Sequence, residues 1–274
     1  MQRTNDLVLA IAGVVYTNLI DGPSQFDGWD IEQSCWRIRV PHTKTQVIQL
    51  LRKHRDARGT AHWEARQPED SPVKSFGIGL TRLRKLAKEI GRDHRLALQL
   101  WASDVYDAKI IGLLIDEPKK MTREQVEQQV EDVGLGMLSH VFASCDATLA
   151  KSPLAFEVAR DWMDSPDALR RQCGFALLYE LSKKKVAGLD DDYLLERIAH
   201  IREQIHAESM WVREAMNTAL MGIGKRNKKL NQAAIRAAKA IGPVAIDYGE
   251  ENRCEPLDVL KHLTSDHLQR KWNA

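Results

Sequence analysis

The stretch "LRRQCGFALL", residues 169–178, has a counterpart in "WVREAMNTAL", residues 211–220. Each stretch begins with a large apolar residue, carries an arginine two positions later, and ends in an apolar pair. The two arginines, Arg171 and Arg213, are 42 residues apart. Similarity at a fixed spacing indicates a repeat architecture, in which one unit of secondary structure recurs along the chain.

Both stretches also carry a small residue, Cys173 in the first and Ala215 in the second. A small side chain lets two helices pack closely, and a period near this length is typical of HEAT-type repeats, which stack pairs of helices into a curved solenoid. The stretch "DVYDAKIIGLL", residues 104–114, has a similar small residue at Ala108, without a basic residue at the matching position. The sequence therefore predicts stacked two-helix repeats.

Helices are expected to follow one another from about residue 44 onward, because almost no stretch shows the alternation of β-branched residues that indicates a strand. The expected helices are 45–58, 79–90, 93–101, 104–115, 122–132, 136–150, 153–163, 166–183, 190–205, 209–223, 230–241 and 256–270.

Capping residues set the expected helix boundaries. Ser165–Pro166 and Ser152–Pro153 each offer a side-chain oxygen followed by a proline, which is typical of a helix start. Thr122 and Gln125 fit a capping box. Helix ends are expected at the glycines that follow apolar-periodic runs, namely Gly91, Gly188, Gly224 and Gly242.

Short connections force consecutive helices to run antiparallel. We therefore expect an all-α fold, an αα-superhelix or solenoid of antiparallel HEAT-like helical repeats, over residues 44–272. Residues 1–43 are expected to form an N-terminal extension with no assigned role. Its apolar stretch "LVLAIAGVV" (7–15) has the length of a targeting segment, but it follows Asp6 and is too short to span a bilayer, so no membrane association is expected.

The composition is that of an ordinary soluble globular protein. Of 274 residues, 43% are hydrophobic, and 40 basic residues nearly balance 38 acidic ones, leaving a formal net charge of +2. Only an uneven distribution of charge could therefore indicate a nucleic-acid partner. Four cysteines form no CxxC pair, which disfavours a zinc or dithiol site: Cys35, Cys145, Cys173 and Cys254. We expect no metal, no cofactor, a monomer and a reducing, cytoplasmic location.

Positive charge is concentrated in the decapeptide "GIGKRNKKLN", residues 222–231, through Lys225, Arg226, Lys228 and Lys229. The surrounding stretch 215–246 holds six basic residues and no acidic one. A second basic stretch lies on the expected helix 79–90 and comprises Arg82, Arg84, Lys85 and Lys88. Such runs either bind the phosphates of a polyanion, or interact favourably with the negative end of a helix dipole and keep a loop soluble. The sequence leaves both interpretations open.

Three arginines near helix starts indicate a further role. Arg170, Arg171 and Arg213 oppose the helix dipole at these positions, so another interaction should hold them there. Contact with phosphate on the inner surface of the solenoid is one interpretation, and pairing with Asp167 or Glu214 is the other.

Three ordered segments resemble a known family: "KSFGIGLTRLRKLAKEIGRDHRLALQLWASDVYDAKIIGLLIDEP" (74–118), "RRQCGFALLYELS" (170–182) and "WVREAMNTALMGIGKRNKKLNQAAIRAAKAIG" (211–242). They are similar to the DNA alkylation repair proteins built from HEAT-like repeats, the group of the AlkD-type alkylpurine DNA glycosylases. The resemblance runs from about residue 45 to 268. It implies a solenoid that cradles duplex DNA, with or without alkylated bases, in a basic concave groove.

The resemblance also implies a site that this sequence matches only in part. The family places a Trp-Asp pair and a second, catalytic Asp on one helix and a further Trp on a later helix, with an arginine that grips phosphate. Only that arginine is matched, by Arg171. The other four positions hold Gly136, Met137, His140 and Thr218. Because neutral histidine offers only a lone pair and protonated histidine repels a cationic sugar, carboxylate-dependent excision is not expected.

His140 could still orient water or contact phosphate, or it could simply be satisfied within helix packing. We interpret the chain as a DNA-binding protein of this family, with Arg170, Arg171, Arg213 and the four cations of 222–231 as the binding residues and His140 as a weak catalytic candidate. The alternative is a non-catalytic scaffold that binds a protein through exposed aromatic residues such as Trp63, Trp101 or Trp211.

Overall fold

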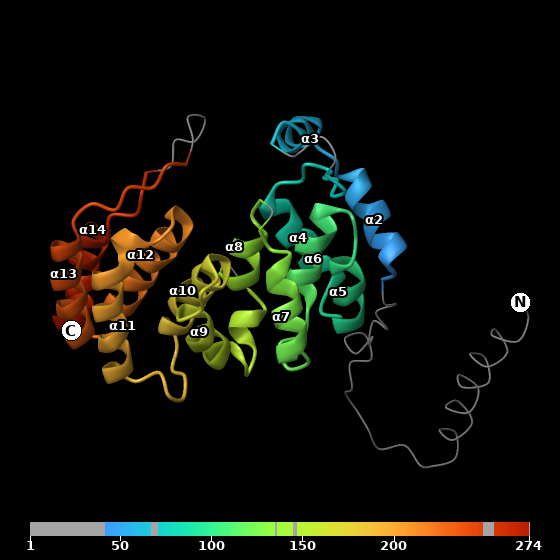
Figure 1. Ribbon diagram of the computed structural model, residues 1–274. Coiled ribbons are helices and arrows are strands. Elements are labelled where there is room, and N and C mark those ends of the chain that lie inside the picture. Colours follow the sequence, from blue (N-terminus) through green and yellow to red (C-terminus); the bar gives the residue numbers. More distant parts are fainter. Residues whose placement is uncertain (1–41, 67–70, 135, 145–146, 249–254, 274) are drawn as a thin grey trace, which may run out of the picture. The chain divides into compact units, whose positions relative to one another are not determined.

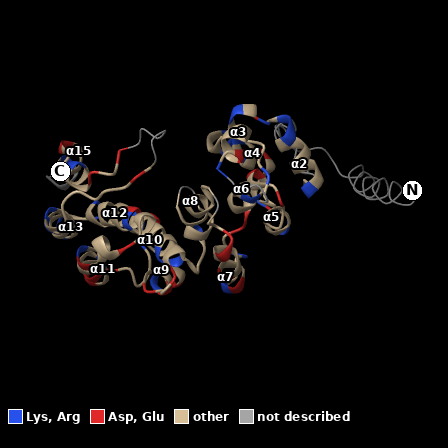
Figure 2. Cartoon of the chain, turned by 45° about the horizontal axis from the view of Figure 1, so that its top comes forward, with Lys and Arg blue, Asp and Glu red and all other residues tan. Residues whose placement is uncertain are grey.

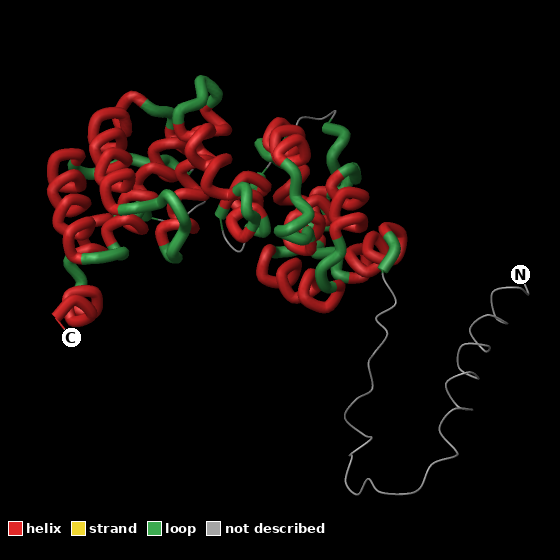
Figure 3. Tube along the Cα trace, turned by 90° about the horizontal axis from the view of Figure 1, so that it is seen from below, coloured by secondary structure: helices red, strands yellow, loops and turns green. Residues whose placement is uncertain are grey.

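The computed structural model describes residues 42–66, 71–134, 136–144, 147–248 and 255–273, all within one compact unit, Pro41–Ala274. The expected extension 1–43 therefore lies outside the described residues, except for His42 and Thr43. Within the described part, helices joined by loops make up the chain, and the sole β-pairing is an isolated parallel bridge between Lys74 and Val105 (Figure 3). The expected all-α fold is confirmed.

The helices succeed one another along the chain (Figure 1). They are α2 (Lys44–Lys53), α3 (Ala57–Glu64), α4 (Leu80–Ile90), α5 (His94–Trp101), α6 (Tyr106–Ile115), α7 (Arg123–Glu131), α8 (Leu138–Ala143), α9 (Ala155–Met163), α10 (Ala168–Ser182), α11 (Asp191–Gln204), α12 (Met210–Gly224), α13 (Lys228–Ile241), α14 (Val259–Leu263) and α15 (Asp266–Asn273). Two short 3-10 helices, η1 (Leu149–Lys151) and η2 (Ile205–Ala207), precede α9 and α12.

The helices form two layers. One layer, called here the even layer, consists of α4, α6, α8, α10 and α12, each packed against the next. The other layer contains α7, α9, α11 and α13. Trp162 of α9 donates a hydrogen bond to Glu127 of α7, and the Phe156 ring of α9 contacts the Tyr193 ring of α11 edge to face. Helix α11 in turn packs against α13. The core of buried aliphatic and aromatic side chains lies between the layers.

The 42-residue repeat is confirmed by the match between α10 and α12. Both helices have 15 residues, and Cys173 of the first and Ala215 of the second are buried. The helices run in the same direction, because Arg171 near the start of α10 pairs with Glu208 just before α12, while Ser182 at the end of α10 lies against Gly222 near the end of α12. Helix starts therefore share one edge of the even layer, and helix ends share the opposite edge.

Three expected helices differ from those observed. Helix 45–58 ends at Lys53, and the unpredicted α3 begins after Asp56, whose carboxylate accepts a hydrogen bond from Gly59 N at 2.7 Å. Helix 136–150 is instead the short α8 followed by η1. Helix 256–270 is divided into α14 and α15 at 264–265. In each case a polar cap or an extended residue interrupts a continuous apolar pattern.

The predicted proline starts are wrong. Asp167, and not Ser165, caps α10 by accepting a hydrogen bond from Arg170 N at 2.8 Å, and α9 begins at Ala155 without a side-chain cap. Thr122 caps α7 as expected, but the Gln125 amide donates to Asp116 rather than completing a capping box. Gly91 and Gly242 end helices with positive φ, whereas Gly224 is the last helical residue of α12.

Candidate nucleic-acid-binding site

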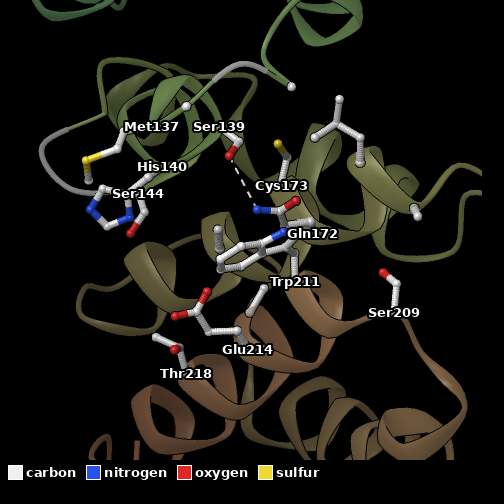
Figure 4. A pocket seen from close by; sticks show the side chains of 16 residues that line it. Met137, Ser139, His140, Ser144, Gln172, Cys173, Ser209, Trp211, Glu214 and Thr218 are labelled. Atoms are coloured by element: carbon white, nitrogen blue, oxygen red, sulfur yellow. Dashed lines mark hydrogen bonds between the residues drawn. The ribbon is translucent and has the colours of Figure 1, made fainter. Parts of the chain in front are cut away.

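A hollow of about 930 Å³ opens between α8, α10 and α12 (Figure 4). Its described lining includes no lysine or arginine, and Glu214 is its sole carboxylate. The other lining residues are Gly134, Gly136, Met137, Ser139, His140, Ser144, Ala168, Leu169, Gln172, Cys173, Ala176, Ser209, Trp211, Ala215 and Thr218. All four positions at which the resemblance places catalytic residues line this one hollow.

The 42-residue repeat determines which side chains α10 and α12 present to the hollow. Equivalent positions of the two helices contribute in pairs: Leu169 and Trp211, Gln172 and Glu214, Cys173 and Ala215, Ala176 and Thr218. Residues spaced by three and four share one helix face. Glu214 was not predicted as a residue of the hollow, although its register with Gln172 in the repeat was the signal that could have identified it.

A tight turn holds α8 against the hollow. Gly136 has a φ of +53°, and a Cβ at this position would lie 2.8 Å from the Tyr106 hydroxyl oxygen. That oxygen accepts a hydrogen bond from Met137 N at 2.8 Å, and the Tyr106 ring stacks on Trp63 with centroids 4.2 Å apart. Burial raises the pKa of the Tyr106 hydroxyl, so it remains protonated at neutral pH. The turn therefore directs the side chains of Met137 and His140 toward the hollow.

His140 is neutral at pH 7. Removal from solvent lowers the pKa of its imidazole below the usual 6.5; Glu214 opposes the shift and the charge of Arg84 adds to it. The neighbouring Cys173 thiol is buried, which raises its pKa to about 12 and keeps it from acting as a nucleophile. The described lining of the hollow thus contains one carboxylate, on α12, and no charged group at the position that the resemblance assigns to the catalytic Asp.

Trp211 and Glu214 form the α12 wall of the hollow. The Trp211 side chain is 45% exposed, and its ring lies 6.3 Å from the Tyr248 ring, centroid to centroid. The Tyr248 hydroxyl donates a hydrogen bond to Glu214 Oε1 at 2.8 Å. On the opposite wall, the Gln172 amide donates to Ser139 Oγ at 3.3 Å. Figure 4 shows His140, Trp211 and Glu214 extending toward the space between α8 and α12.

The other two tryptophans considered for a protein-binding surface are half-buried. Trp63 stacks on Tyr106, and the Lys109 ammonium lies 4.7 Å from the centre of the Trp101 ring. Trp211 is therefore the aromatic side chain among these three that is available to a ligand.

Arg170 and Arg171 lie at the edge where the even-layer helices start, and both bind carboxylates. Arg170 bridges Glu127 and Glu131 of α7, whose acidic residues are visible in Figure 2. Arg171 forms a bidentate pair with Glu208, at 2.7 and 2.8 Å, and its third nitrogen donates to two backbone carbonyls. Pairing with acids was expected as one alternative, and the predicted Asp167 does pair with Arg170 through a longer contact of 3.9 Å. Glu214, the other predicted acid, is not among these partners, and Glu127, Glu131 and Glu208 were not predicted.

The four cations of 222–231 are divided between the end of α12 and the start of α13. Lys225 follows α12 as its C-cap, and Arg226 donates to the carbonyls of Ser182, Lys184 and Leu189, which ties α12 to the end of α10. Lys228 and Lys229 begin α13, in the other layer, where Lys229 pairs with Asp192 of α11 at 3.2 Å. The structure does not bring these cations together with Arg171, because α10 and α12 each separate the two edges by about 20 Å.

A different set of cations gathers where the even-layer helices end. Arg84, Lys88, Arg92 and Lys151 line a second hollow, of about 370 Å³, whose described lining includes no carboxylate. Burial lowers the pKa of Lys184 and of Lys225. The Glu180 carboxylate, which pairs with Lys183 at 2.7 Å, opposes the shift of Lys184, Lys151 adds to it, and Lys183 adds to the shift of Lys225. We call the set the basic edge: Arg84, Lys88, Arg92, Lys151, Lys183, Lys184 and Lys225.

Of the predicted binding residues, only Lys225 belongs to the basic edge. Arg213 is half-buried on α12, with no ion pair seen among the described residues. Within the same described part of the chain, no group of three metal-binding side chains occurs, and no helix is long and apolar enough to cross a membrane.

Residues 47–252 match the protein family described as "DNA alkylation repair enzyme". The chain belongs to the DNA alkylation repair enzyme family. The uncharacterized protein Lin0241 of Listeria innocua is 26% identical over 198 residues, which are 69% of this chain and 81% of that protein. Lmo0209 of Listeria monocytogenes is 25% identical over the same shares.

A solved structure has the same fold as this member of the DNA alkylation repair enzyme family. It is described as "a new family of proteins related to the HEAT-like repeat DNA glycosylases with affinity for branched DNA structures". The TM-score is 0.70 at 23% identity, and the match covers 84% of this chain and 95% of that chain. The family and the HEAT-like solenoid expected from the sequence are therefore confirmed.

Proposed function

We propose that this protein of the DNA alkylation repair enzyme family binds DNA, with phosphates along the basic edge and the hollow facing the bound strand. The observation that carries this proposal is the grouping of cations on and after α4, on η1, and after α10 and α12. Positive charges spread over several helices suit a polyanion better than one small anion.

The state of the basic edge supports the same proposal. No carboxylate pairs with Lys184 or Lys225 among the described residues; Lys184 donates to the Ala150 carbonyl, and Lys225 lies 3.2 Å from the Met221 sulfur. Their lowered pKa values mean that burial destabilises each charge, and for Lys225 the neighbouring Lys183 adds to this cost. A phosphate would offset the cost of burial, which a solvated surface lysine does not bear.

The binding role predicted for Arg170, Arg171, Arg213, Arg226, Lys228 and Lys229 remains a prediction. To bind DNA, Arg170 and Arg171 would have to exchange their carboxylate partners for a phosphate. Arg226 would have to give up its hydrogen bonds to backbone carbonyls. Lys225 can meet DNA without breaking an ion pair, so we assign the first contact to the basic edge.

Binding can be measured by fluorescence anisotropy with a labelled duplex and a labelled four-way junction. Junctions are included because a structurally similar protein is described as having affinity for branched DNA. Between about 50 and 200 mM salt we expect affinity to fall by one to several powers of ten, since each phosphate contact releases counterions. Affinity that is absent for both DNAs, or independent of salt, would overturn the proposal.

Charge reversal locates the contact. Lys184→Glu with Lys225→Glu should weaken binding at least about tenfold at low salt and lower the slope of log Kd against log salt by about two. The matched control is Arg236→Glu with Lys239→Glu, which reverses the same charge at exposed positions further along α13. We expect this control to change Kd by no more than about threefold. Equal losses from both pairs would contradict binding at the basic edge.

Excision of methylated purines through His140 is not expected, because a neutral imidazole cannot stabilise a cationic sugar. Purified protein incubated with duplex DNA that carries methylated purines should release no free base above the rate without protein. His140→Ala should leave both this background and the Kd unchanged within about twofold. Release that His140→Ala abolishes would make the protein an enzyme that uses this residue.

A further inference from the structure

We infer that the hollow between α8, α10 and α12 binds one unpaired nucleobase of the bound DNA, with Trp211 as the stacking surface and Glu214 as the hydrogen-bond acceptor. This inference rests on the proposed function, because the base belongs to a strand whose phosphates lie on the basic edge. It adds a base-binding site that a purely electrostatic contact does not require.

The lining of the hollow excludes phosphate. It offers no described lysine or arginine, and the Glu214 carboxylate repels an anion. Met137 and Trp211, at 46% and 45% exposure, are two of the three large apolar side chains exposed among the described residues, and both line the hollow. Of the three parts of a nucleotide, only the base has a broad apolar face and polar edges, so the lining matches the base.

Trp211 can stack a base because its ring is exposed and supported. The Tyr248 ring lies 6.3 Å from it, and Trp211 is on the first turn of a helix anchored by Arg171 through Glu208. A base that stacks on an aromatic side chain gains affinity irrespective of its sequence, because every base has a π-face. The indole therefore supplies affinity without discrimination.

Glu214 makes the hollow discriminate between the four bases. Its Oε1 accepts the hydrogen bond from Tyr248, which fixes the carboxylate and leaves Oε2 without a described partner. A carboxylate accepts hydrogen bonds and donates none, so it favours a base edge that presents N–H groups. Guanine presents two adjacent donors, and adenine and cytosine present an amino group, whereas the single N3–H of thymine lies between two carbonyl oxygens that repel a carboxylate. We expect guanine to bind best and thymine worst.

The distance between the hollow and the basic edge fits a DNA strand in which one base has left the base stack. Glu214 and Lys225 are 11 residues apart on α12, which corresponds to about 16 Å of helix. Arg84, whose charge contributes to the lowered pKa of His140, does not line the hollow. The base in the hollow is therefore a few nucleotides away from the phosphates at the end of α12, as in a bulge or at a branch point.

The test compares duplexes that carry a single bulged nucleotide: guanine, thymine or an abasic residue. For the natural protein, the guanine bulge should bind about five- to tenfold more tightly than the abasic bulge. Trp211→Ala should bring this ratio close to one, and Trp211→Phe should restore most of it. Glu214→Gln should reduce the preference for guanine over thymine and keep the advantage of either base over the abasic bulge.

The basic-edge variant serves as the control that separates the two proposals. Lys184→Glu with Lys225→Glu should weaken binding to all three bulges by the same factor and leave their ratios unchanged. Equal affinity for the three bulges, with salt-dependent binding intact, would overturn the base site alone. Absence of DNA binding would overturn the proposed function. A ratio that Trp211→Ala does not change would place the bound base elsewhere on the protein.

Discussion

An Asp107→Ala variant should lose about 3–5 kcal/mol of folding free energy. Asp107 of α6 is 0% exposed, and its carboxylate accepts hydrogen bonds from Ser75 Oγ at 2.9 Å, Phe76 N at 2.7 Å and Ile78 N at 3.0 Å. Alanine removes the acceptor and leaves two backbone N–H groups with no acceptor in place of the carboxylate. Each unsatisfied donor costs about 1–3 kcal/mol, and bonds to a charged group exceed neutral ones.

Urea denaturation followed by circular dichroism measures this loss. Asp104→Ala is a matched control three residues earlier, where the side chain is exposed and the backbone carbonyl alone bonds to Lys74 N, so its effect should stay below about 0.5 kcal/mol. Asp107→Asn keeps an acceptor oxygen and should lose about half as much as alanine. A loss below about 1 kcal/mol for Asp107→Ala would show that the loop finds other partners.

The consequence of Asp107→Ala should extend to the hollow. Tyr106, the preceding residue, bonds to Met137 N, and Lys74 in the loop bonds to Tyr106 N. If the loop 74–78 detaches from α6, the turn at Gly136 loses support, and Met137 on the α8 wall of the hollow loses its fixed position. We therefore expect the preference for a bulged base to disappear in this variant before the salt-dependent affinity of the basic edge does.

The helices were predictable because they depend on local pattern. The α10–α12 pair followed from a 42-residue spacing, and the observed helices repeat that spacing from Ala168 to Met210. The missed α3 depended on long-range packing instead. Gly59 lies so close to Gly77 that a Cβ would meet its carbonyl oxygen at 2.1 Å, and no periodicity within α3 reveals that neighbour.

The DNA-binding residues were less predictable from the sequence, because a run of basic residues does not determine to which surface each side chain belongs. The stretch 222–231 contains four cations, but Asn227 caps α13 with its side chain, so the chain turns between Lys225 and Lys228 and sends them to different layers. Arg226 looked equivalent to its neighbours in the sequence. Its partners are carbonyls about 40 residues earlier, and only the packed structure brings those atoms within 3.2 Å.

Gly174→Ala should destabilise the protein by about 2 kcal/mol, and Gly174→Val by about 4 kcal/mol or more. Gly174 is in the middle of α10, where a Cβ would lie 2.7 Å from Met163 N and 3.1 Å from Ala159 O. These are backbone atoms of α9, so they yield only if the two helices separate. Alanine recovers up to about 1 kcal/mol of helix propensity, which is less than the cost of the clash. Valine adds volume without that gain.

Gly134→Ala is the matched control, because the nearest atom to its Cβ would be Leu169 Cδ2 at 4.0 Å and its φ is not positive. Its unfolding free energy should stay within about 0.5 kcal/mol of the natural protein. Thermal denaturation should rank the stabilities Gly134→Ala, Gly174→Ala, Gly174→Val from highest to lowest. Because Cys173 and Gln172 line the hollow beside Gly174, separation of α10 from α9 should also weaken the preference for a bulged guanine. Equal stability of the alanine variants would show that α9 can move away from α10 at little cost.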